Sequence, residues 1–336
     1  MSERPKIFAN LPPQLYRELF APDADTALRA LADVTFRDDD RRLTSGELAA
    51  ALPGYDAVIT GWGTPAFTDE VLDAADRLRL IAHSAGSVKA MLPEAVFARD
   101  IAVTHAAGAI APAVAEMALL LVMLGLRHVH RYDHALKNGA QWEGQKAFGA
   151  PMELRGQRVG VIGASYVGRH FIALMRALQC EVWVYDPYLS EEQATTLGVR
   201  RAALHDLLAQ CPIISIHAPS TPETRHMFGK EEFARMRDGA LLVNTARSWM
   251  VDEAALLTEL HTGRIAAALD VFDTEPLPLD SPFRQLANVI LTPHVAGASV
   301  QARFRQGVTI ASEIARFFSG QPLQYAVTRE RYAILA

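Results

Sequence analysis

The chain has 336 residues, a length typical of two domains rather than one. Half of its residues are hydrophobic, which excludes intrinsic disorder. Lys and Arg number 33 against 38 Asp and Glu, a formal charge of −5, so the composition offers no basic surface for nucleic acid. Two cysteines, Cys180 and Cys211, are too few for a disulfide framework and suit a reducing compartment. We therefore expect a cytoplasmic globular protein.

The first residues contain no apolar segment of signal-peptide length. The longest apolar stretch, 111–126, includes Glu116 and is shorter than the roughly 18 to 20 residues that span a bilayer. A buried helix is the better interpretation of this stretch, and we expect no membrane association.

In chain order, the first hundred residues alternate short apolar runs with amphipathic stretches. We predict strands at 6–9, 34–36, 57–60 and 78–83, and helices at 14–20, 44–52 and 68–75. Thr44 with Glu47 forms a capping box, and Thr68 fits a helix N-cap. Such alternation indicates βαβ units and a parallel sheet.

One long helix is expected from about 112 to 137, ending at Asn138-Gly139, and a polar, glycine-bearing stretch over 139–156 follows it. A second series then begins, with a helix at 167–178 and strands at 159–162, 181–185, 213–217, 240–244, 266–271 and 289–292. These strands are nearly continuous apolar runs, as expected where helices cover both faces of a sheet. The pattern predicts two α/β units that meet near residue 108.

A glycine-containing turn after the strand 159–162 carries the first chemical signal. Gly163-Ala-Ser165-Tyr166-Val167-Gly168 is the dinucleotide fingerprint with serine as its middle glycine, and this hydroxyl is able to donate to a phosphate oxygen. Such turns also occur without a ligand. However, Asp186 ends the next strand, where a carboxylate accepts the ribose hydroxyls of NAD and repels the 2′-phosphate of NADP. Together they predict NAD binding, and the missing second glycine of Gly-x-Ser-x-Gly argues against a nucleophilic serine.

Three later loops carry an arginine, a glutamate and a histidine, each just after a predicted strand. The segments are Asn244-Thr245-Ala246-Arg247, Asp273-Thr274-Glu275-Pro276 and Thr292-Pro293-His294. Ligands bind outside the carboxyl ends of strands in open α/β sheets, so these loops should line one crevice. Ketone reduction needs a proton donor, a cation that polarises the carbonyl and a group that tunes the donor. Singly, each residue is more often a surface charge, but the joint pattern favours catalysis.

With these motifs, residues 80–310 resemble the D-isomer-specific 2-hydroxyacid dehydrogenase family. The resemblance implies that Arg247 grips the substrate carboxylate and carbonyl, and that His294 exchanges the proton with the carbonyl oxygen. It implies that Glu275 supports His294, and a carboxylate in that place stabilises the imidazolium. Glutamine stands at this position in the family's formate dehydrogenase branch, so Glu275 argues against that activity.

The resemblance also supplies the remaining binding residues. It places Asp270 at the nicotinamide amide. The predicted cofactor contacts are Gly163, Ser165, Tyr166, Val167, Gly168, Asp186, Ala218, Pro219, Thr245, Ala246, Asp270 and Gly297. The substrate carboxylate is expected on the backbone of Gly86, Ser87 and Val88.

The family's substrate domain is discontinuous, which sets the expected domain order. We expect residues 1–107 and 299–336 to form the substrate domain and 108–298 to form a Rossmann NAD-binding domain. The fold class is therefore α/β, with two Rossmann-like or flavodoxin-like parallel-sheet domains and a cleft between them. The long helix belongs to a region that makes a twofold dimer in the family, so a homodimer is expected.

The absence of basic side chains from two loops of the predicted substrate domain narrows the choice of substrate. Relatives acting on 3-phosphoglycerate neutralise its phosphate with Arg or Lys, and none stands at the corresponding places in 61–64 or at Ser84, which disfavours that substrate. Trp62 and Trp249 either shape an apolar pocket or merely pack. His130 and His134 lack the acidic residues of a metal motif, so no metal is expected.

Two alternatives stay open. One is a phosphoglycerate dehydrogenase that recruits its cations elsewhere in the chain. The other is a dinucleotide-sensing binding protein, like the corepressors that resemble this family.

Overall fold

The protein is described by a computed structural model covering residues 3–141 and 150–334, so part of the predicted stretch 139–156 lies outside the described residues. The chain divides into two compact units. Unit 1 comprises Met1–Ile110 and Ala298–Ala336, and unit 2 comprises Ala111–Gly297. The sequence placed these boundaries at 107/108 and 298/299.

Unit 1 is built on a five-stranded parallel sheet in the order β2-β1-β3-β4-β5. Its strands are β1 (Lys6–Ala9), β2 (Asp33–Phe36), β3 (Ala57–Thr60), β4 (Leu80–His83) and β5 (Ala102–His105). The first four were predicted from sequence, and β5 was missed. Side chains alternate between the two faces, so Ile7 and Ala9 enter one core cluster while Phe8 enters the other.

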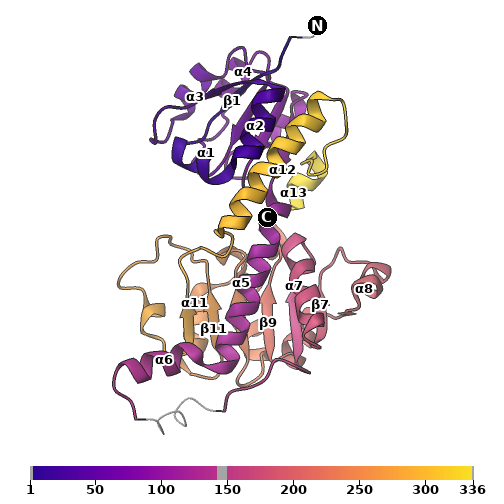
Figure 1. The fold of residues 1–336 in the computed structure, drawn as a ribbon. Helices are drawn as coiled ribbons and strands as arrows, with labels where there is room; N and C mark the ends of the chain where they lie inside the picture. Colours follow the sequence, from indigo (N-terminus) through magenta and orange to yellow (C-terminus); the bar gives the residue numbers. More distant parts are fainter. Residues whose placement is uncertain (1–2, 142–149, 335–336) are drawn as a thin grey trace. The chain divides into compact units, whose positions relative to one another are not determined.

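Helices cover both faces of this sheet. One face packs against α1 (Pro13–Leu19), α2 (Pro22–Leu31) and α12 (Val300–Phe318), and Figure 1 shows the yellow α12 beside the indigo N-terminal helices. The other face packs against α3 (Ser45–Ala51), α4 (Asp69–Ala74) and a 3₁₀ helix at Glu94–Ala98, and Tyr332 of α13 (Arg329–Ile334) contacts that core. The predicted capping box of Thr44 and Glu47 is present, and Thr68 caps α4.

Unit 2 is built on a seven-stranded parallel sheet in the order β12-β11-β10-β9-β6-β7-β8. The strands are β6 (Arg158–Ile162), β7 (Glu181–Tyr185), β8 (Arg200–Arg201), β9 (Ile213–Ile216), β10 (Leu241–Asn244), β11 (Ala266–Leu269) and β12 (Val289–Leu291). The strand order reverses between β6 and β9. This reversal is the switch point at which doubly wound sheets bind ligands.

Helices again cover both faces of the sheet in unit 2. One core holds residues of α5 (Ala107–Arg127), α7 (Tyr166–Ala177) and α8 (Glu191–Leu197). The opposite core holds residues of α9 (Leu204–Gln210), α10 (Lys230–Arg235) and α11 (Glu253–His261). The strands predicted as nearly continuous apolar runs are therefore apolar because helices bury both faces of their sheet.

The predicted single helix over 112–137 is wrong in one respect. The structure has two helices, α5 and then α6 (Val129–Lys137), separated by His128 at φ +53°. A left-handed residue interrupts the hydrogen-bond ladder of a right-handed helix, so the axis changes there. By length and hydropathy α5 is also able to span a membrane, but Ala118, Leu121 and Val122 are buried in the core of unit 2.

Candidate active site

The glycine turn after β6 lies at the switch point of unit 2 and touches the loop after β9. Gly163 has φ +94°, and a Cβ there would lie 2.7 Å from the backbone of Ala218. A Cβ on Gly168 would lie 2.1 Å from the carbonyl oxygen of Gly163. Both positions therefore require glycine, and the turn places the N-terminus of α7 at the sheet edge where doubly wound folds bind anionic ligands. Tyr166 and Val167 form the first turn of this helix.

The hydroxyl of Ser165 makes two hydrogen bonds within the protein. It donates to the carbonyl oxygen of His217 at 2.7 Å and accepts from the N–H of Gly168 at 3.3 Å. In this arrangement its single hydrogen is used by His217, and the predicted contact of Ser165 with the cofactor stays a prediction. Ser165 caps α7 and ties the turn to the β9 loop, which carries Ala218 and Pro219.

Asp186 ends β7 against the same turn. Its Oδ2 accepts from the N–H of Ala164 at 2.7 Å, and its Oδ1 accepts from the N–H of Tyr188 at 2.8 Å. A carboxylate has about four acceptor positions, so both oxygens keep capacity for ribose hydroxyls. The backbone bonds fix the carboxylate beside the turn.

His294 and Glu275 form a hydrogen-bonded pair in unit 2. His294 Nδ1 lies 2.6 Å from Glu275 Oε2, and Glu275 Oε1 accepts from the N–H of Phe272 at 3.0 Å. The imidazole is about half exposed. Its Nε2 has no hydrogen-bond partner among the described residues, so that nitrogen is available to a substrate. The backbone of His294 has φ +53°, a left-handed conformation that few non-glycine residues adopt.

Arg247 lies on the loop after β10, close enough to Glu275 for their charges to interact. Burial lowers the pKa of Arg247 and the Glu275 carboxylate raises it, with burial the larger effect. The guanidinium donates to the carbonyl oxygen of Ala246 at 2.6 Å. Below it, the buried amide of Asn244 donates to the carbonyl oxygen of Arg247 and accepts from the N–H of Ala246. The loop that carries the cation is thus held rigidly.

Two buried polar residues support this site in different ways. Asp270 is fully buried, and its carboxylate accepts from Thr292 Oγ1 and from the N–H groups of Val295 and Ala296. It therefore holds the loop of His294 and Gly297 in place, and its contact with nicotinamide stays a prediction. Thr245 is also buried, yet its Oγ1 has no hydrogen-bond partner in the described part of the chain. An unpaired, buried hydroxyl on the loop after β10 fits a bound dinucleotide.

The predicted substrate loop, Gly86 to Val88, follows β4 in unit 1. His105 Nδ1 lies 2.8 Å from the carbonyl oxygen of Gly86, and the backbone of Ser87 hydrogen-bonds to His83. Burial lowers the pKa of His83 to about 3 and also lowers that of His105. Over 3–141 and 150–334 the N–H groups of Gly86 and Ser87 donate to no acceptor, which suits an anion. No sequence motif marks His83 and His105 as residues that support this loop.

The two tryptophans have different surroundings. Trp249 packs, because its Nε1 donates to the carbonyl oxygen of Thr221 at 2.9 Å and Arg225 lies over its ring. Trp62 packs against Arg303, which lies 4.2 Å from its ring centroid, and it also lines a pocket of unit 1 whose other walls include three arginines, so that pocket is not purely apolar.

Comparison with known proteins identifies the family. Residues 117–296 match the model of the D-isomer specific 2-hydroxyacid dehydrogenase NAD binding domain. The chain belongs to this family. The matched range lies within unit 2 and contains the glycine turn, Asp186 and the pair of His294 and Glu275.

Relatives with curated names extend this dehydrogenase likeness to unit 1. The chain is 37% identical over 282 residues to a D-3-phosphoglycerate dehydrogenase of Archaeoglobus fulgidus, covering 84% of this chain but 53% of that protein. This chain thus spans about half the length of that relative. It is 32% identical to the glyoxylate reductase of Aeropyrum pernix, covering 98% of this chain and 97% of that one. The structure of Rhodotorula graminis D-mandelate dehydrogenase superposes with a TM-score of 0.85 at 21% identity, over 97% of this chain and 98% of the other, and this likeness concerns the fold alone.

Proposed function

We propose that the protein is an NAD-dependent dehydrogenase that interconverts a 2-oxo acid and its D-2-hydroxy acid. The observation that carries the proposal is the 2.6 Å pair of His294 and Glu275 beside Arg247, on three loops at the carboxyl edge of one sheet. Family membership and the glyoxylate reductase relative support it. The unpaired Thr245 hydroxyl and the glycine turn at 163–168 support binding of a dinucleotide.

Each residue has a distinct task in reduction. When bound, NADH supplies the hydride that adds to C2 of the 2-oxo acid. Arg247 pairs with the substrate carboxylate and polarises the carbonyl through its planar fork. The protonated Nε2 of His294 gives its proton to the carbonyl oxygen, which becomes the hydroxyl, and the imidazole is left neutral. Glu275 accepts from Nδ1, so it orients the ring and stabilises the imidazolium form. Oxidation runs the same proton transfer backwards.

The cofactor is proposed to be NAD rather than NADP. Asp186 is held beside the glycine turn by two backbone N–H groups, where its negative charge favours two ribose hydroxyls and repels a 2′-phosphate.

Arg247→Lys tests the substrate contact. Lysine keeps the charge but not the two parallel N–H groups, so we expect KM for 2-oxo acids to rise and kcat to fall, together at least tenfold in kcat/KM, with unchanged NADH affinity. Steady-state kinetics with a panel of 2-oxo acids and a calorimetric NADH titration measure both quantities. Arg225→Lys is the matched control, because Arg225 lies over Trp249. Unaltered kinetics in Arg247→Lys would remove it from the site, and absence of turnover by the unmutated enzyme would favour the sensor alternative.

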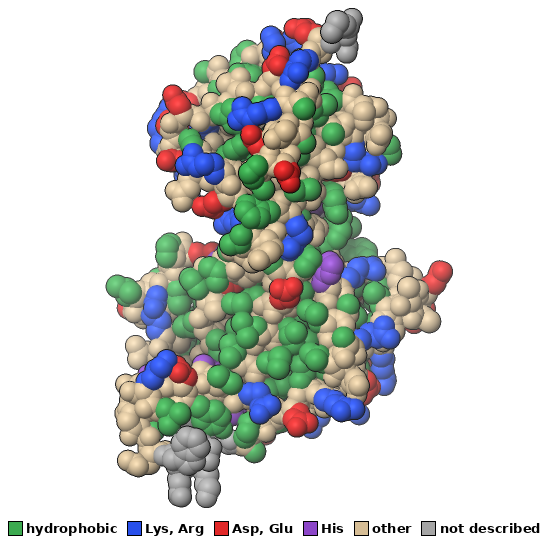
Figure 2. All heavy atoms as spheres, viewed as in Figure 1, with side chains coloured by type: hydrophobic (Ala, Val, Ile, Leu, Met, Phe, Trp, Pro, Cys, Tyr) green, Lys and Arg blue, Asp and Glu red, His purple; other side chains and the backbone are tan. Residues whose placement is uncertain are grey.

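We also propose a homodimer formed through the outer face of α5. Leu120 and Met123 on this helix are 49% and 44% exposed, and Figure 2 shows hydrophobic side chains gathered over this part of unit 2. Large exposed apolar patches mark association sites. Light scattering should give a dimer mass for the unmutated protein and a monomer mass for Leu120→Asp combined with Met123→Asp. A monomeric unmutated protein would refute this.

A further inference from the structure

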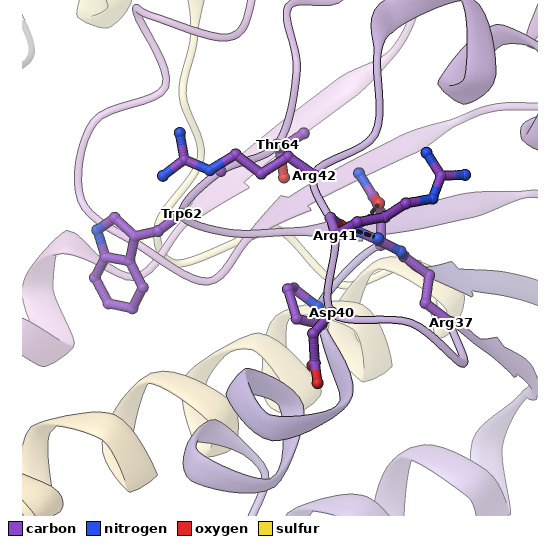
Figure 3. A pocket seen from close by; sticks show the side chains of 9 residues that line it. Arg37, Asp40, Arg41, Arg42, Trp62 and Thr64 are labelled. Atoms are coloured by element: carbon purple, nitrogen blue, oxygen red, sulfur yellow. Dashed lines mark hydrogen bonds between the residues drawn. The ribbon is translucent and has the colours of Figure 1, made fainter.

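A pocket of about 210 Å³ opens at the carboxyl edge of the sheet in unit 1. Its walls come from the segments that follow three neighbouring strands, β2, β1 and β3. The lining residues are Asn10, Pro12, Arg37, Asp40, Arg41, Arg42, Trp62, Gly63 and Thr64, and Figure 3 shows them from close by. The carboxyl edge is where open α/β sheets bind ligands.

One wall of the pocket carries a buried donor without an acceptor. Asn10 is 2% exposed, and its Oδ1 accepts from Arg37 at 3.5 Å. Its Nδ2 has no hydrogen-bond partner among the described residues. Because buried polar groups are almost always paired, this amide is poised for an acceptor that enters the pocket.

The pocket also contains one arginine that forms no ion pair with the described residues. Arg37 bonds to Asp39 and to the carbonyl oxygen of Arg41, while Arg41 pairs with Asp39 at 2.8 Å and with Glu47 at 2.6 Å. Arg42 has no ion pair or hydrogen bond in the part of the chain described. Its guanidinium lies on the Trp62 side of the pocket, whereas the carboxylate of Asp40 points the other way (Figure 3).

The loop after β3 makes room for Arg42. Gly63 has φ +83°, and a Cβ there would lie 3.3 Å from Arg42 Nε, so glycine allows the close approach. Thr64 Oγ1 accepts from the N–H of Gly61 at 3.1 Å and keeps its own hydrogen for a ligand. Arg303 also lies over the ring of Trp62, 4.2 Å from its centroid.

This loop is in direct contact with the start of the predicted substrate loop. Thr60 and His83 pair across β3 and β4, and Ser84 Oγ donates to the carbonyl oxygen of Thr60 at 2.7 Å. A Cβ on Gly61 would lie 2.9 Å from Ser84 Oγ. The loop that lines the pocket and the loop that carries Gly86 and Ser87 therefore follow neighbouring strands at the same edge of the sheet.

We propose that this pocket binds a second, distal anionic group of the substrate, a phosphate or a carboxylate. The proposal rests on the proposed function, because it takes the loop of Gly86 and Ser87 to hold the first carboxylate. Arg42 supplies the counter-charge, and Asn10 Nδ2 and the Thr64 hydroxyl supply hydrogen bonds. The sequence disfavoured phosphorylated substrates because 61–64 and Ser84 bring no cation. The structure supplies one from the segment after β2 instead.

Kinetics with three 2-oxo acids test the proposal. The probes are 2-oxobutyrate with an uncharged tail, 2-oxoglutarate with a terminal carboxylate and 3-phosphohydroxypyruvate with a terminal phosphate. The unmutated enzyme should favour at least one of the charged-tail acids. Arg42→Gln should lower kcat/KM for that acid roughly tenfold or more, mainly through KM, and leave 2-oxobutyrate unchanged. Arg42→Lys should recover part of the loss.

One further variant of the same segment serves as the control, and another provides a second test. Arg41→Gln removes a charge that Asp39 and Glu47 already balance, so it should preserve the charged-tail preference. Asp40→Asn removes a carboxylate from the pocket lining and should lower KM for the charged-tail acids. Equal losses in Arg41→Gln and Arg42→Gln would overturn the proposal, as would a preference for 2-oxobutyrate in the unmutated enzyme.

A binding measurement separates this proposal from the proposed function. Calorimetry with inorganic phosphate and with succinate should show binding to the unmutated protein that Arg42→Gln weakens and Arg41→Gln does not. If these anions bind in this way but no 2-oxo acid is turned over, the proposed function fails while the anion pocket stands. If neither anion binds and Arg42→Gln leaves the charged-tail kinetics intact, the pocket assignment fails on its own.

Discussion

At the residue scale, His294 and Glu275 come from two different loops and form one hydrogen-bonded acid–base pair. Nδ1 is occupied by the carboxylate at 2.6 Å, so Nε2 is the nitrogen left for proton transfer. Beneath it, the buried carboxylate of Asp270 takes three hydrogen bonds from 292–296, which fixes the loop without contributing a free charge. General acid catalysis requires a proton donor that is held in one position and is open to the substrate, and the half-exposed imidazole of His294 meets both conditions.

Glu275→Gln tests the electrostatic part of this arrangement. Glutamine keeps the side-chain shape but removes the negative charge that favours the imidazolium. Reduction needs the protonated ring, so the alkaline limb of kcat/KM for reduction should move to lower pH. The pH profile of NADH oxidation with a 2-oxo acid measures it. His294→Ala should lose roughly 10²–10⁴ in kcat with NADH binding retained. An unmoved limb together with an active His294→Ala enzyme would mean another proton donor.

At the scale of elements, the strand–turn–helix units were largely predictable from sequence, and the errors have physical causes. The helix α2 was missed because Ala21, a residue without a capping side chain, precedes it. The break at His128 was missed because a non-glycine residue adopts the left-handed conformation there. The hydrogen bond from Ser165 to the carbonyl oxygen of His217 was not predicted, because only the pairing of β6 with β9 brings that acceptor to the turn.

Dependence on tertiary contacts also explains which site residues the sequence did not reveal. His294, Glu275 and Arg247 sit in recognisable motifs at strand ends, so sequence alone placed them on neighbouring loops. Asn10 and Arg42 belong to no motif, and only the strand order β2-β1-β3 brings them to one pocket. Residues that meet only through the tertiary fold leave no motif in the local sequence from which their shared site could be predicted.

Asp186→Ala tests the contribution of the β7 end to cofactor choice. Loss of the carboxylate removes both the acceptor for the ribose hydroxyls and the repulsion of a 2′-phosphate. We expect NADH affinity to fall roughly tenfold and the preference for NADH over NADPH to shrink by a larger factor, as measured by calorimetric titration of both cofactors. Asp206→Ala, on the surface helix α9, is the control. Equal binding of NADPH and NADH by the unmutated protein would contradict the assignment.

At the scale of the whole molecule, the C-terminal segment belongs to unit 1 because a buried carboxylate fastens it there. Glu313 is 1% exposed and accepts from Thr104 Oγ1 at 2.8 Å and from the N–H of Tyr325 at 2.9 Å. Helix α12 also packs on α1 and α2. These contacts close unit 1 around chain segments from both ends of the sequence.

Buried neutral histidines make both units sensitive to acid. Burial lowers the pKa of His83 in unit 1 and of His217 in unit 2 from 6.5 to about 3. The unfolded chain binds these protons near pH 6.5 while the folded chain does not, so stability is full above that pH and falls as the pH drops toward 3. At pH 5 each histidine should cost about 2 kcal/mol of unfolding free energy.

Urea unfolding at pH 7.5 and pH 5 measures this loss. His217→Gln should reduce the difference between the two pH values by about 2 kcal/mol, whereas His170→Gln, at an exposed position of α7, should not. A pH-independent unfolding free energy in the unmutated protein would show that these histidines are not held neutral.

The transfer of a labelled hydride tests the central claim most directly. The unmutated protein is incubated with NADH carrying deuterium at the transferable position of C4 and with the 2-oxo acid it turns over fastest. The account predicts a D-2-hydroxy acid with deuterium on C2, found by mass spectrometry and chiral chromatography, and none with His294→Ala on the same timescale. An L-2-hydroxy acid, an unlabelled product or no product from the whole panel would contradict it.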